Sequence, residues 1–372
     1  MFAIKNISRN FSTSPIMILT IYLLFFSACR QEKIIKINKS FYYWKTTFHW
    51  QETDNNLIVK TLKINKLYVH LFDVDWQNGK AQPSGTLSFR DSLPQNLSII
   101  PTVFITQNVV LQLGSHENYE VDSLAKKIVI KVFNMLQRQQ INKITELQID
   151  CDWTLKSQQI YFKLLQSIKS FAQLQQPTIR ISCTIRLYPM KYHKKMGIPP
   201  VDKGLLMCYN LNNPTILGNE NAILSYKNAK SYLSSLADYP LPLDIGLPIF
   251  AWAAQFRNGK FLRLLHKIRH KNLANNNNFK ILDSNIYQAI QTTTLNNYEN
   301  NYQNNYEIMA GDILKIDEIQ TEELQQTANF IYEKLSNKSY KEMNVVFFHY
   351  DNEVIENYDI QKVFFEQRNL LK

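Results

Sequence analysis

Glycine and cysteine are both scarce in this chain of 372 residues, which contains nine glycines and four cysteines. No glycine-rich turn follows the first predicted strand, residues 67–75, so the fingerprint of a dinucleotide-binding fold is missing. No two cysteines have the CxxC spacing. Cys151, Cys183 and Cys208 fall in three different predicted strands, which argues against a disulfide framework and against a zinc site. We therefore expect no cofactor and no metal centre.

Positive charge is in excess, and the lysines and arginines are spread along the chain. The chain has 42 Lys and Arg against 31 Asp and Glu, a net charge of +11. The basic residues are scattered, with only short clusters such as Lys194-Lys195 and residues 263–271. A nucleic-acid-binding protein needs a concentrated basic face, so we expect no nucleic-acid partner. A solvated basic surface close to anionic lipid head groups agrees better with this distribution.

The N-terminus has the three parts of a secretory signal peptide. Lys5 and Arg9 supply a basic region, residues 16–26 form an uncharged apolar run, and Ser27-Ala28-Cys29 follows. The apolar run is too short for a membrane span, which needs about 20 residues. We expect residues 1–28 to be a signal peptide and residues 29–41 to be a tether.

The cysteine at the expected cleavage point indicates a lipid anchor. Phe26-Ser27-Ala28-Cys29 resembles the lipobox of bacterial lipoproteins, although a leucine is usual where Phe26 stands. In that class the cysteine is lipidated and becomes the first residue of the mature protein. The resemblance implies a membrane anchor at Cys29, in the periplasm or on the outer-membrane surface of the bacterial envelope. The alternative is an ordinary signal peptide with an incidental cysteine.

Beyond the tether, apolar runs of strand length alternate with stretches of helical periodicity. The predicted strands are residues 67–75, 97–106, 147–152, 179–187, 204–210, 243–251, 312–316 and 345–350. Apolar strands that alternate with helices indicate a parallel sheet covered on both faces. The count of eight predicts an α/β fold, a (β/α)8 TIM-type barrel that forms a single domain over residues 42–372. Residues 272–307 are rich in Asn and Tyr and are predicted to be a low-complexity insertion.

Polar and aromatic side chains gather where the predicted strands end, and active sites of TIM barrels lie at that end. Asp150 and Asp152 are the clearest pair, since alternation along a strand places both on one face. Paired acids beside aromatic rings suit a site that binds and polarises a sugar. The predicted catalytic residues are Asp150, Asp152, Asp73, Asp75 and Tyr209, and the predicted carbohydrate-binding residues are Trp76, Trp153, Arg186, Asn210, Trp252 and His349.

Each candidate also has a purely structural interpretation. Asp73 and Asp75 could bond backbone groups or cap a helix, and the later pair of acids could form ion pairs with Arg186. The three tryptophans and His349 could belong to the core. The four acids could instead bind a hard cation, although the chain contains no His-Glu-x-x-His pattern. Glu220, in a polar loop, could be a displaced catalytic acid.

Three short segments resemble family 18 of the glycoside hydrolases. Asp150-Cys151-Asp152-Trp153 is similar to the core of that family's Asp-x-Asp-x-Glu motif, and Met207-Cys208-Tyr209 is similar to its Met-x-Tyr motif. Trp252 resembles the aromatic floor of its sugar site. The position of the catalytic glutamate, however, holds Thr154, which cannot protonate a glycosidic oxygen. Two functions stay open: a hydrolase that uses another strand-end acid, and a non-catalytic glycan-binding or scaffold protein.

Several longer segments of the sequence are similar to a family of Bacteroidota lipoproteins. The matching segments are residues 43–48, 72–76, 150–154, 199–202 and 207–210, and the resemblance covers most of residues 42–260. It implies a barrel in an exported, lipid-anchored protein but no particular activity. It leaves the substrate and the oligomeric state open.

Overall fold

The computed structural model describes residues 36–114, 118–218, 220–299 and 302–336, together with residues 338, 342–351, 355, 358 and 360. The expected signal peptide, Cys29 and the first part of the expected tether lie outside these residues. Within the part that is described, none of the helices combines the length and the apolar character that a membrane crossing requires.

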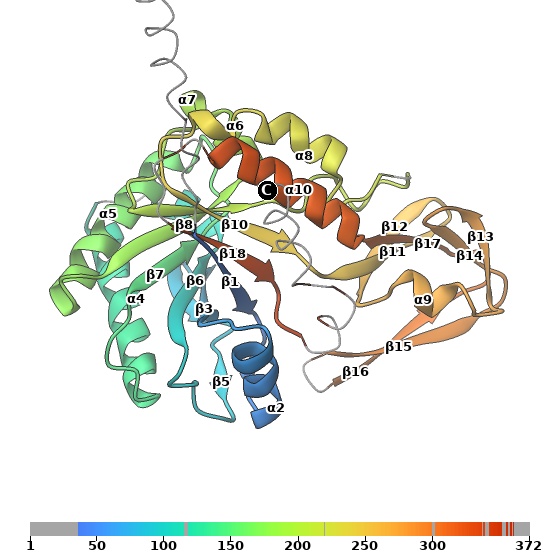
Figure 1. Cartoon of the computed structure of the whole chain (residues 1–372), viewed down its shortest axis with the longest axis horizontal. Coiled ribbons are helices and arrows are strands. Elements are labelled where there is room, and N and C mark those ends of the chain that lie inside the picture. The colour runs from blue at the N-terminus through green and yellow to red at the C-terminus, as the bar shows by residue number, and fades with distance from the viewer. Residues whose placement is uncertain are drawn as a thin grey trace, which may run out of the picture.

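Eight parallel strands form a closed barrel (Figure 1). They are β1 (Lys36–Tyr43), β3 (Lys66–Gln77), β6 (Ser98–Ile105), β7 (Glu146–Asp150), β8 (Arg180–Arg186), β9 (Lys203–Met207), β10 (Leu243–Pro248) and β18 (Glu342–Phe348). The sheet closes because β1 pairs in parallel with β18 on one side and with β3 on the other. The predicted α/β TIM-type barrel is therefore confirmed.

Helices cover the outside of the barrel (Figure 1). The long ones are α4 (Asn118–Arg138), α5 (Gln158–Gln175), α8 (Tyr226–Leu233) and α10 (Thr321–Leu335). The short ones are α2 (Glu52–Asn55), η1 (Asn56–Thr61), α3 (Gln107–Leu113), α6 (Leu187–Lys191), α7 (His193–Met196) and η2 (Leu236–Asp238). Each long helix buries one apolar stripe, as Leu164, Leu165 and Ile168 of α5 show. This leaves the strand ends and the loops that follow them to form the barrel mouth.

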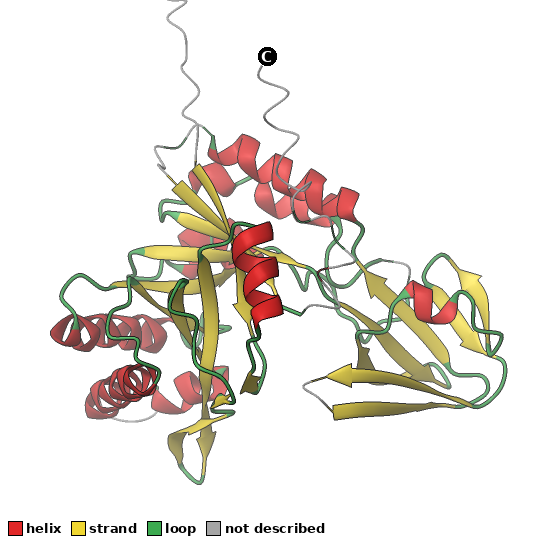
Figure 2. Cartoon of the chain, turned by 60° about the horizontal axis from the view of Figure 1, so that its bottom comes forward, coloured by secondary structure: helices red, strands yellow, loops and turns green. Residues whose placement is uncertain are grey.

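Between β10 and β18 the chain leaves the barrel and forms a second, antiparallel sheet, which projects beside the barrel in Figure 2. The sheet contains β11 (Ala251–Arg257), β12 (Lys260–His266), β13 (Phe279–Asp283), β14 (Ile286–Ala289) and β17 (Ile313–Glu318). The same part of the chain also contains a separate hairpin, formed by β15 (Thr293–Glu299) and β16 (Tyr302–Ile308), and helix α9 (His270–Leu273). We call residues 251–318 the insertion module. It has a separate apolar core that includes Leu265, Leu314 and Ile316.

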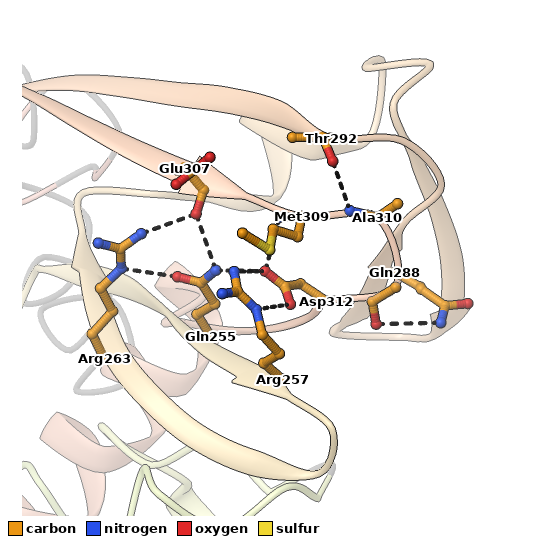
Figure 3. Close-up of polar contacts among 10 residues, drawn as sticks. Gln255, Arg257, Arg263, Gln288, Thr292, Glu307, Met309, Ala310 and Asp312 are labelled. Carbon is orange, nitrogen blue, oxygen red and sulfur yellow. Dashed lines mark hydrogen bonds and ion pairs between the residues drawn. The ribbon is translucent and has the colours of Figure 1, made fainter.

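A buried carboxylate organises the polar contacts of the insertion module (Figure 3). Asp312 is 1% exposed and accepts two hydrogen bonds of 2.8 Å from Arg257 and one of 2.7 Å from Gln255. Arg263 donates to the Gln255 side chain at 2.9 Å and to the Glu307 carbonyl at 3.0 Å. These bonds join β11, β12, β16 and the start of β17. A charge-assisted network of this kind fixes the register of several strands together.

Two parts of the predicted strand order were wrong. Of residues 312–316, predicted as the seventh barrel strand, residues 313–316 belong to β17, which pairs with β11 in the insertion module. The missing barrel strand is β1, and it occupies residues 36–41 of the expected tether. The first half of β1 is polar and partly exposed, and only Ser40 to Tyr43 are buried, so its sequence lacks a continuous apolar run. The Asn- and Tyr-rich stretch near 272–307 does lie in an insertion, but that insertion is larger and contains regular strands.

Three further short strands are present. They are β2 (Thr47–Phe48), which pairs with β5 (Ser88–Phe89), and β4 (Lys80–Ser84), which extends the barrel sheet beside β3.

The interior of the barrel holds a connected set of buried polar side chains. Asp244 on β10 is 1% exposed and forms an ion pair with Lys203 on β9. Its carboxylate accepts hydrogen bonds from the Tyr68 hydroxyl at 3.2 Å, and from the Asn344 side chain at 2.8 Å and backbone N–H at 2.7 Å. One carboxylate thus connects four strands of the barrel. A buried charge is tolerated only when it is paired and hydrogen-bonded, so this set is specific for one strand arrangement.

Replacement of Asp244 by alanine should destabilise the protein strongly. The buried Lys203 ammonium would lose its counter-ion, and the Tyr68 hydroxyl would lose its acceptor. We expect the free energy of unfolding to fall by about 3–5 kcal/mol. Urea denaturation followed by circular dichroism measures this change. The control is Asp238→Ala on the exposed end of η2, which should change stability by less than about 0.5 kcal/mol. Similar small losses in both variants would contradict the role given to Asp244.

Candidate functional site

An open depression of about 850 Å³ lies at the barrel mouth, and we call it the mouth pocket. It is lined by Gln107, Leu111, Asp152, Trp153, Thr154, Leu155, Lys156, Arg186, Tyr188, Pro189, Met196 and Asn210. These residues come from the ends of β6, β7, β8 and β9 and the segments that follow them. They lie at the carboxyl ends of parallel strands, where a barrel of this type places its ligands.

Polar pairs rise along the neighbouring strands β7 and β8 toward the mouth. The parallel register places Gln148 opposite Ser182, deep in the barrel. Two residues further along each strand, Thr184 donates a hydrogen bond to Asp150. After two more residues Arg186 binds Asp152. Because side chains alternate along a strand, these pairs all face the barrel interior, and the last pair reaches the mouth pocket.

Asp152 is held by a bidentate ion pair. Arg186 donates from Nε to one carboxylate oxygen at 2.6 Å and from Nη2 to the other at 2.7 Å. The Asp152 side chain is 46% exposed and that of Arg186 is 32% exposed, so the pair forms part of the pocket surface. The fork geometry of a guanidinium fits a carboxylate closely and fixes both groups. Both oxygens of Asp152 are therefore engaged.

Asp150 lies beneath this pair and does not line the mouth pocket. It is buried, and Thr184 Oγ1 donates to it at 2.5 Å. Burial raises the pKa of Asp150 to about 6, because the ionised form is poorly solvated there, and the nearby charge of Asp152 adds to this shift. Asp150 is therefore an acid that exchanges its proton near neutral pH, but from within the barrel.

Thr154 occupies the place at which the resemblance to family 18 implies a catalytic glutamate. Its hydroxyl accepts a hydrogen bond of 3.0 Å from Gln107, and its backbone N–H donates to Ser157 at 2.9 Å. The pocket wall here is an amide and a hydroxyl, which carry no proton that can be transferred near neutral pH. Among the lining residues, Asp152 is the only carboxylic acid.

Two of the predicted aromatic binding residues, Trp153 and Trp252, and the predicted catalytic residue Tyr209 are mostly buried. Trp153 is 5% exposed and packs on Phe162, with ring centres 5.2 Å apart. Trp252 is 8% exposed and donates its indole N–H to Asp317 at 2.9 Å, so it is anchored to the insertion module. Tyr209 is 3% exposed and stacks on Phe348 at 5.5 Å. Burial also raises the pKa of Tyr209 well above its ordinary value. These three rings fill the mouth and expose little face to a ligand.

The exposed aromatic ring of the mouth pocket is Tyr188, which was not among the predicted site residues. Tyr188 lies in α6, directly after the strand that carries Arg186, and is 47% exposed. The sequence feature that could have indicated Tyr188 as a site residue is its position, two residues beyond Arg186 at the end of a predicted strand. Asn210, a predicted binding residue, also lines the pocket and adopts a positive φ of 57°.

Asp73 and Asp75, the acids at the end of the first predicted strand, lie outside the lining of the mouth pocket. Asp73 contacts Nε2 of His70 at 2.7 Å. Asp75 accepts hydrogen bonds from the Trp76 backbone N–H at 2.8 Å and from Thr106 at 3.1 Å, and these lower its pKa. Trp76 lines a different depression, beside α4. The acids are thus used in local hydrogen bonds, as the structural interpretation expected.

The remaining candidates also lie outside the pocket lining. Burial lowers the pKa of His349 to about 4, so its imidazole is neutral at neutral pH. Glu220 is exposed and accepts a hydrogen bond from Asn228 at 3.2 Å. Across the described part of the chain, the structure brings no three His, Cys, Asp or Glu side chains together in a way that could hold a metal ion. The four predicted acids therefore do not form one cation site.

Comparison with known proteins gives matches at the level of structure alone. No protein family model and no curated protein sequence matches this chain. The spore cortex-lytic enzyme SleL of Bacillus megaterium QM B1551 is similar in structure, with a TM-score of 0.51, 11% identity, and 88% of this chain and 75% of that chain covered. A chitinase from Chromobacterium violaceum ATCC 12472 matches with a TM-score of 0.50 and 10% identity over 90% of this chain and 99% of that one. These two likenesses support the fold, a TIM-type barrel.

The raised pKa of Asp150 predicts a specific pH dependence of stability. The ordinary pKa of 3.8 applies to the unfolded chain, so between about pH 4 and pH 6 the folded state binds more protons than the unfolded state. The contribution of Asp150 to stability therefore falls as pH rises through this window, by up to about 3 kcal/mol.

Asp150→Asn removes this titration and keeps an acceptor for Thr184. We expect the variant to gain stability relative to the wild type as pH rises from 4 to 7. Urea denaturation of both proteins at several pH values measures the difference, in which the titration of all other groups cancels. A difference that stays constant across this range would show that Asp150 titrates normally.

Proposed function

We propose that this protein binds a carbohydrate at the mouth pocket without hydrolysing it. The observation that carries this proposal is the pairing of the pocket's single carboxylate, Asp152, with Arg186, while Thr154 occupies the place of the proton donor. Glycoside hydrolysis requires a carboxylic acid that protonates the leaving oxygen, and in most families a second carboxylate beside the sugar. The mouth pocket offers one carboxylate, whose two oxygens are already bound.

The composition of the pocket supports a sugar as the ligand. The exposed Tyr188 ring offers a flat apolar face, against which the C–H face of a pyranose ring can pack. Gln107, Asn210 and Arg186 supply amide and guanidinium groups for hydroxyl groups. An apolar pocket with a few placed polar groups is typical of small-ligand sites. The likeness of the fold to a chitinase and to a cortex-lytic enzyme supports the same ligand class.

A second candidate function is a glycoside hydrolase that uses Asp150 as its acid. The observation in its favour is the pKa of about 6, which suits proton transfer near neutrality. Asp150 is buried beneath Asp152 and Arg186, so a substrate could reach it only if this ion pair opened. The binding function needs no such rearrangement, and for this reason we favour it.

We further propose that the protein is exported and lipid-anchored at Cys29 in the bacterial envelope. Support comes from the basic, apolar and small-residue segments before Cys29. Residues 29–35 would span at most roughly 25 Å when extended. Lys36 begins β1 at the end of the barrel opposite the mouth. A short anchor would therefore hold the mouth pocket on the side that faces away from the membrane.

Glycan binding without turnover is tested on the purified full chain in a neutral detergent. We expect a glycan array to identify a ligand, and chromogenic glycosides of the same sugars to be released no faster than in a protein-free blank. Tyr188→Ala should weaken binding roughly three- to tenfold because the ring loses its stacking contact. The control is Leu174→Ala, a 77% exposed residue at the far end of α5. Turnover that disappears in Asp150→Asn would establish the hydrolase instead.

The lipid anchor predicts that Cys29→Ser moves the protein out of the membrane fraction. Fractionation of cells, with incorporation of labelled fatty acid as a second readout, measures this change. Lys5→Arg keeps the basic character of the N-terminus and serves as the control, which should remain in the membrane fraction. Equal membrane association of the Cys29→Ser variant and the wild type would refute an anchor at this residue.

A further inference from the structure

Most of the excess positive charge comes from one segment of the chain. No acidic residue occurs between Asp152 and Asp202, whereas this segment contains eight Lys and Arg. The rest of the chain has 34 basic and 31 acidic residues, so its charges nearly balance. The acid-free segment forms α5, β8, α6 and α7. It supplies eight of the twelve residues that line the mouth pocket, among them Lys156, Arg186 and Tyr188.

Several of these cations lie at or beside the pocket with no acid to neutralise them. Lys156 lines the pocket and is exposed. Lys194 and Lys195 are exposed on α7, next to the pocket residue Met196. None of these three lysines forms an ion pair with a carboxylate in the part of the chain that the structure describes. By contrast, Lys169 of the same segment pairs with Asp202 at 2.5 Å, outside the pocket.

The ion pair between Asp152 and Arg186 does not cancel the positive charge of these lysines. Arg186 uses Nε and Nη2 to bind Asp152, so the two charges compensate each other. Its other terminal nitrogen, Nη1, donates to no acceptor among the described residues and remains able to bind a ligand. The pocket lining therefore combines a neutralised acid with the uncompensated ammonium group of Lys156, and the two exposed lysines of α7 precede the lining residue Met196. Tyr188 and Leu155, which are 47% and 44% exposed, line the same pocket.

We propose that the mouth pocket selects an acidic saccharide, one whose sugars carry carboxylates or sulfates. This inference rests on the proposed glycan-binding function and narrows its ligand class. A sugar ring would pack on Tyr188 while its anionic groups face Lys156 and the lysines of α7. A neutral glycan would make the same ring contact but would leave the ammonium groups without a partner. Charge complementarity of this kind determines specificity more than it raises affinity.

The test compares saccharides that share a backbone and differ only in charge. Binding of the full chain in a neutral detergent is measured for oligogalacturonate and its methyl ester, and for a sulfated oligosaccharide and its desulfated form. Two or three exposed charge pairs should raise the affinity for the acidic form about tenfold over that for the neutral form at low ionic strength. This advantage should shrink as salt is raised toward 1 M, because the Debye length falls to about 3 Å. The pair with the larger difference identifies the anionic group.

Variants assign the preference to particular side chains. Lys156→Gln should weaken binding of the acidic form about two- to fivefold more than binding of the neutral form, because it removes the charge and keeps a hydrogen-bond donor. Tyr188→Ala should weaken binding of both forms equally. The matched control is Lys143→Gln, an exposed lysine in the loop before β7, at the opposite end of the barrel, which should change neither.

Three results would overturn the inference. Equal affinity for acidic and neutral forms would refute charge selection while the proposed glycan binding stands. A complete absence of glycan binding would remove the proposed function as well. The third result concerns a single-stranded oligonucleotide of the same net charge. If it binds as tightly as the acidic saccharide, the pocket detects charge without recognising a sugar.

Discussion

The buried carboxylate of Asp244 is the constraint on which the barrel depends. An ionised group inside a protein is tolerated only if other groups replace its lost hydration. Here Lys203, Tyr68 and Asn344 do so, and they come from three other strands of the barrel. These contacts can form together only when the sheet is closed in this register. The geometry of the mouth follows from that closure, because β7 and β8 are aligned within the same sheet.

The alignment of β7 and β8 decides the chemistry of the mouth pocket. In this register Asp152 lies beside Arg186, and the pocket's acid becomes one half of an ion pair. Burial separates Asp150 from the pocket and keeps its pKa near 6. Thr154 occupies the place of a proton donor. The ends of β7 and β8 therefore form a polar part of the pocket wall, next to the basic residues of the acid-free segment. The arrangement suits recognition of a ligand more than cleavage of a bond.

The insertion module contributes to the mouth through packing. Trp252, at the start of β11, is fixed by Asp317 and contacts Phe250, with ring centres 5.1 Å apart. Tyr209 and Phe348 continue this aromatic layer across the barrel end. These rings are mostly buried, and the open depression lies at the ends of β6, β7, β8 and β9. This position places the pocket against the acid-free segment, whose lysines give it a positive charge.

The alternation of apolar strands and helices was sufficient to predict a TIM barrel, and strand periodicity was sufficient to place Asp150 and Asp152 on one face. The sequence also determined that no glutamate stands at Thr154 and that residues 153–201 contain no acid. It did not reveal β1, whose polar first half is stabilised by long-range pairing with β18, or the place of residues 312–316 in a second sheet. Only the tertiary structure decided that Asp152 is paired, that Trp153, Trp252 and Tyr209 are mostly buried, and that Tyr188 is exposed. Pairing and burial depend on residues far apart in the chain, which local patterns of hydrophobicity do not contain.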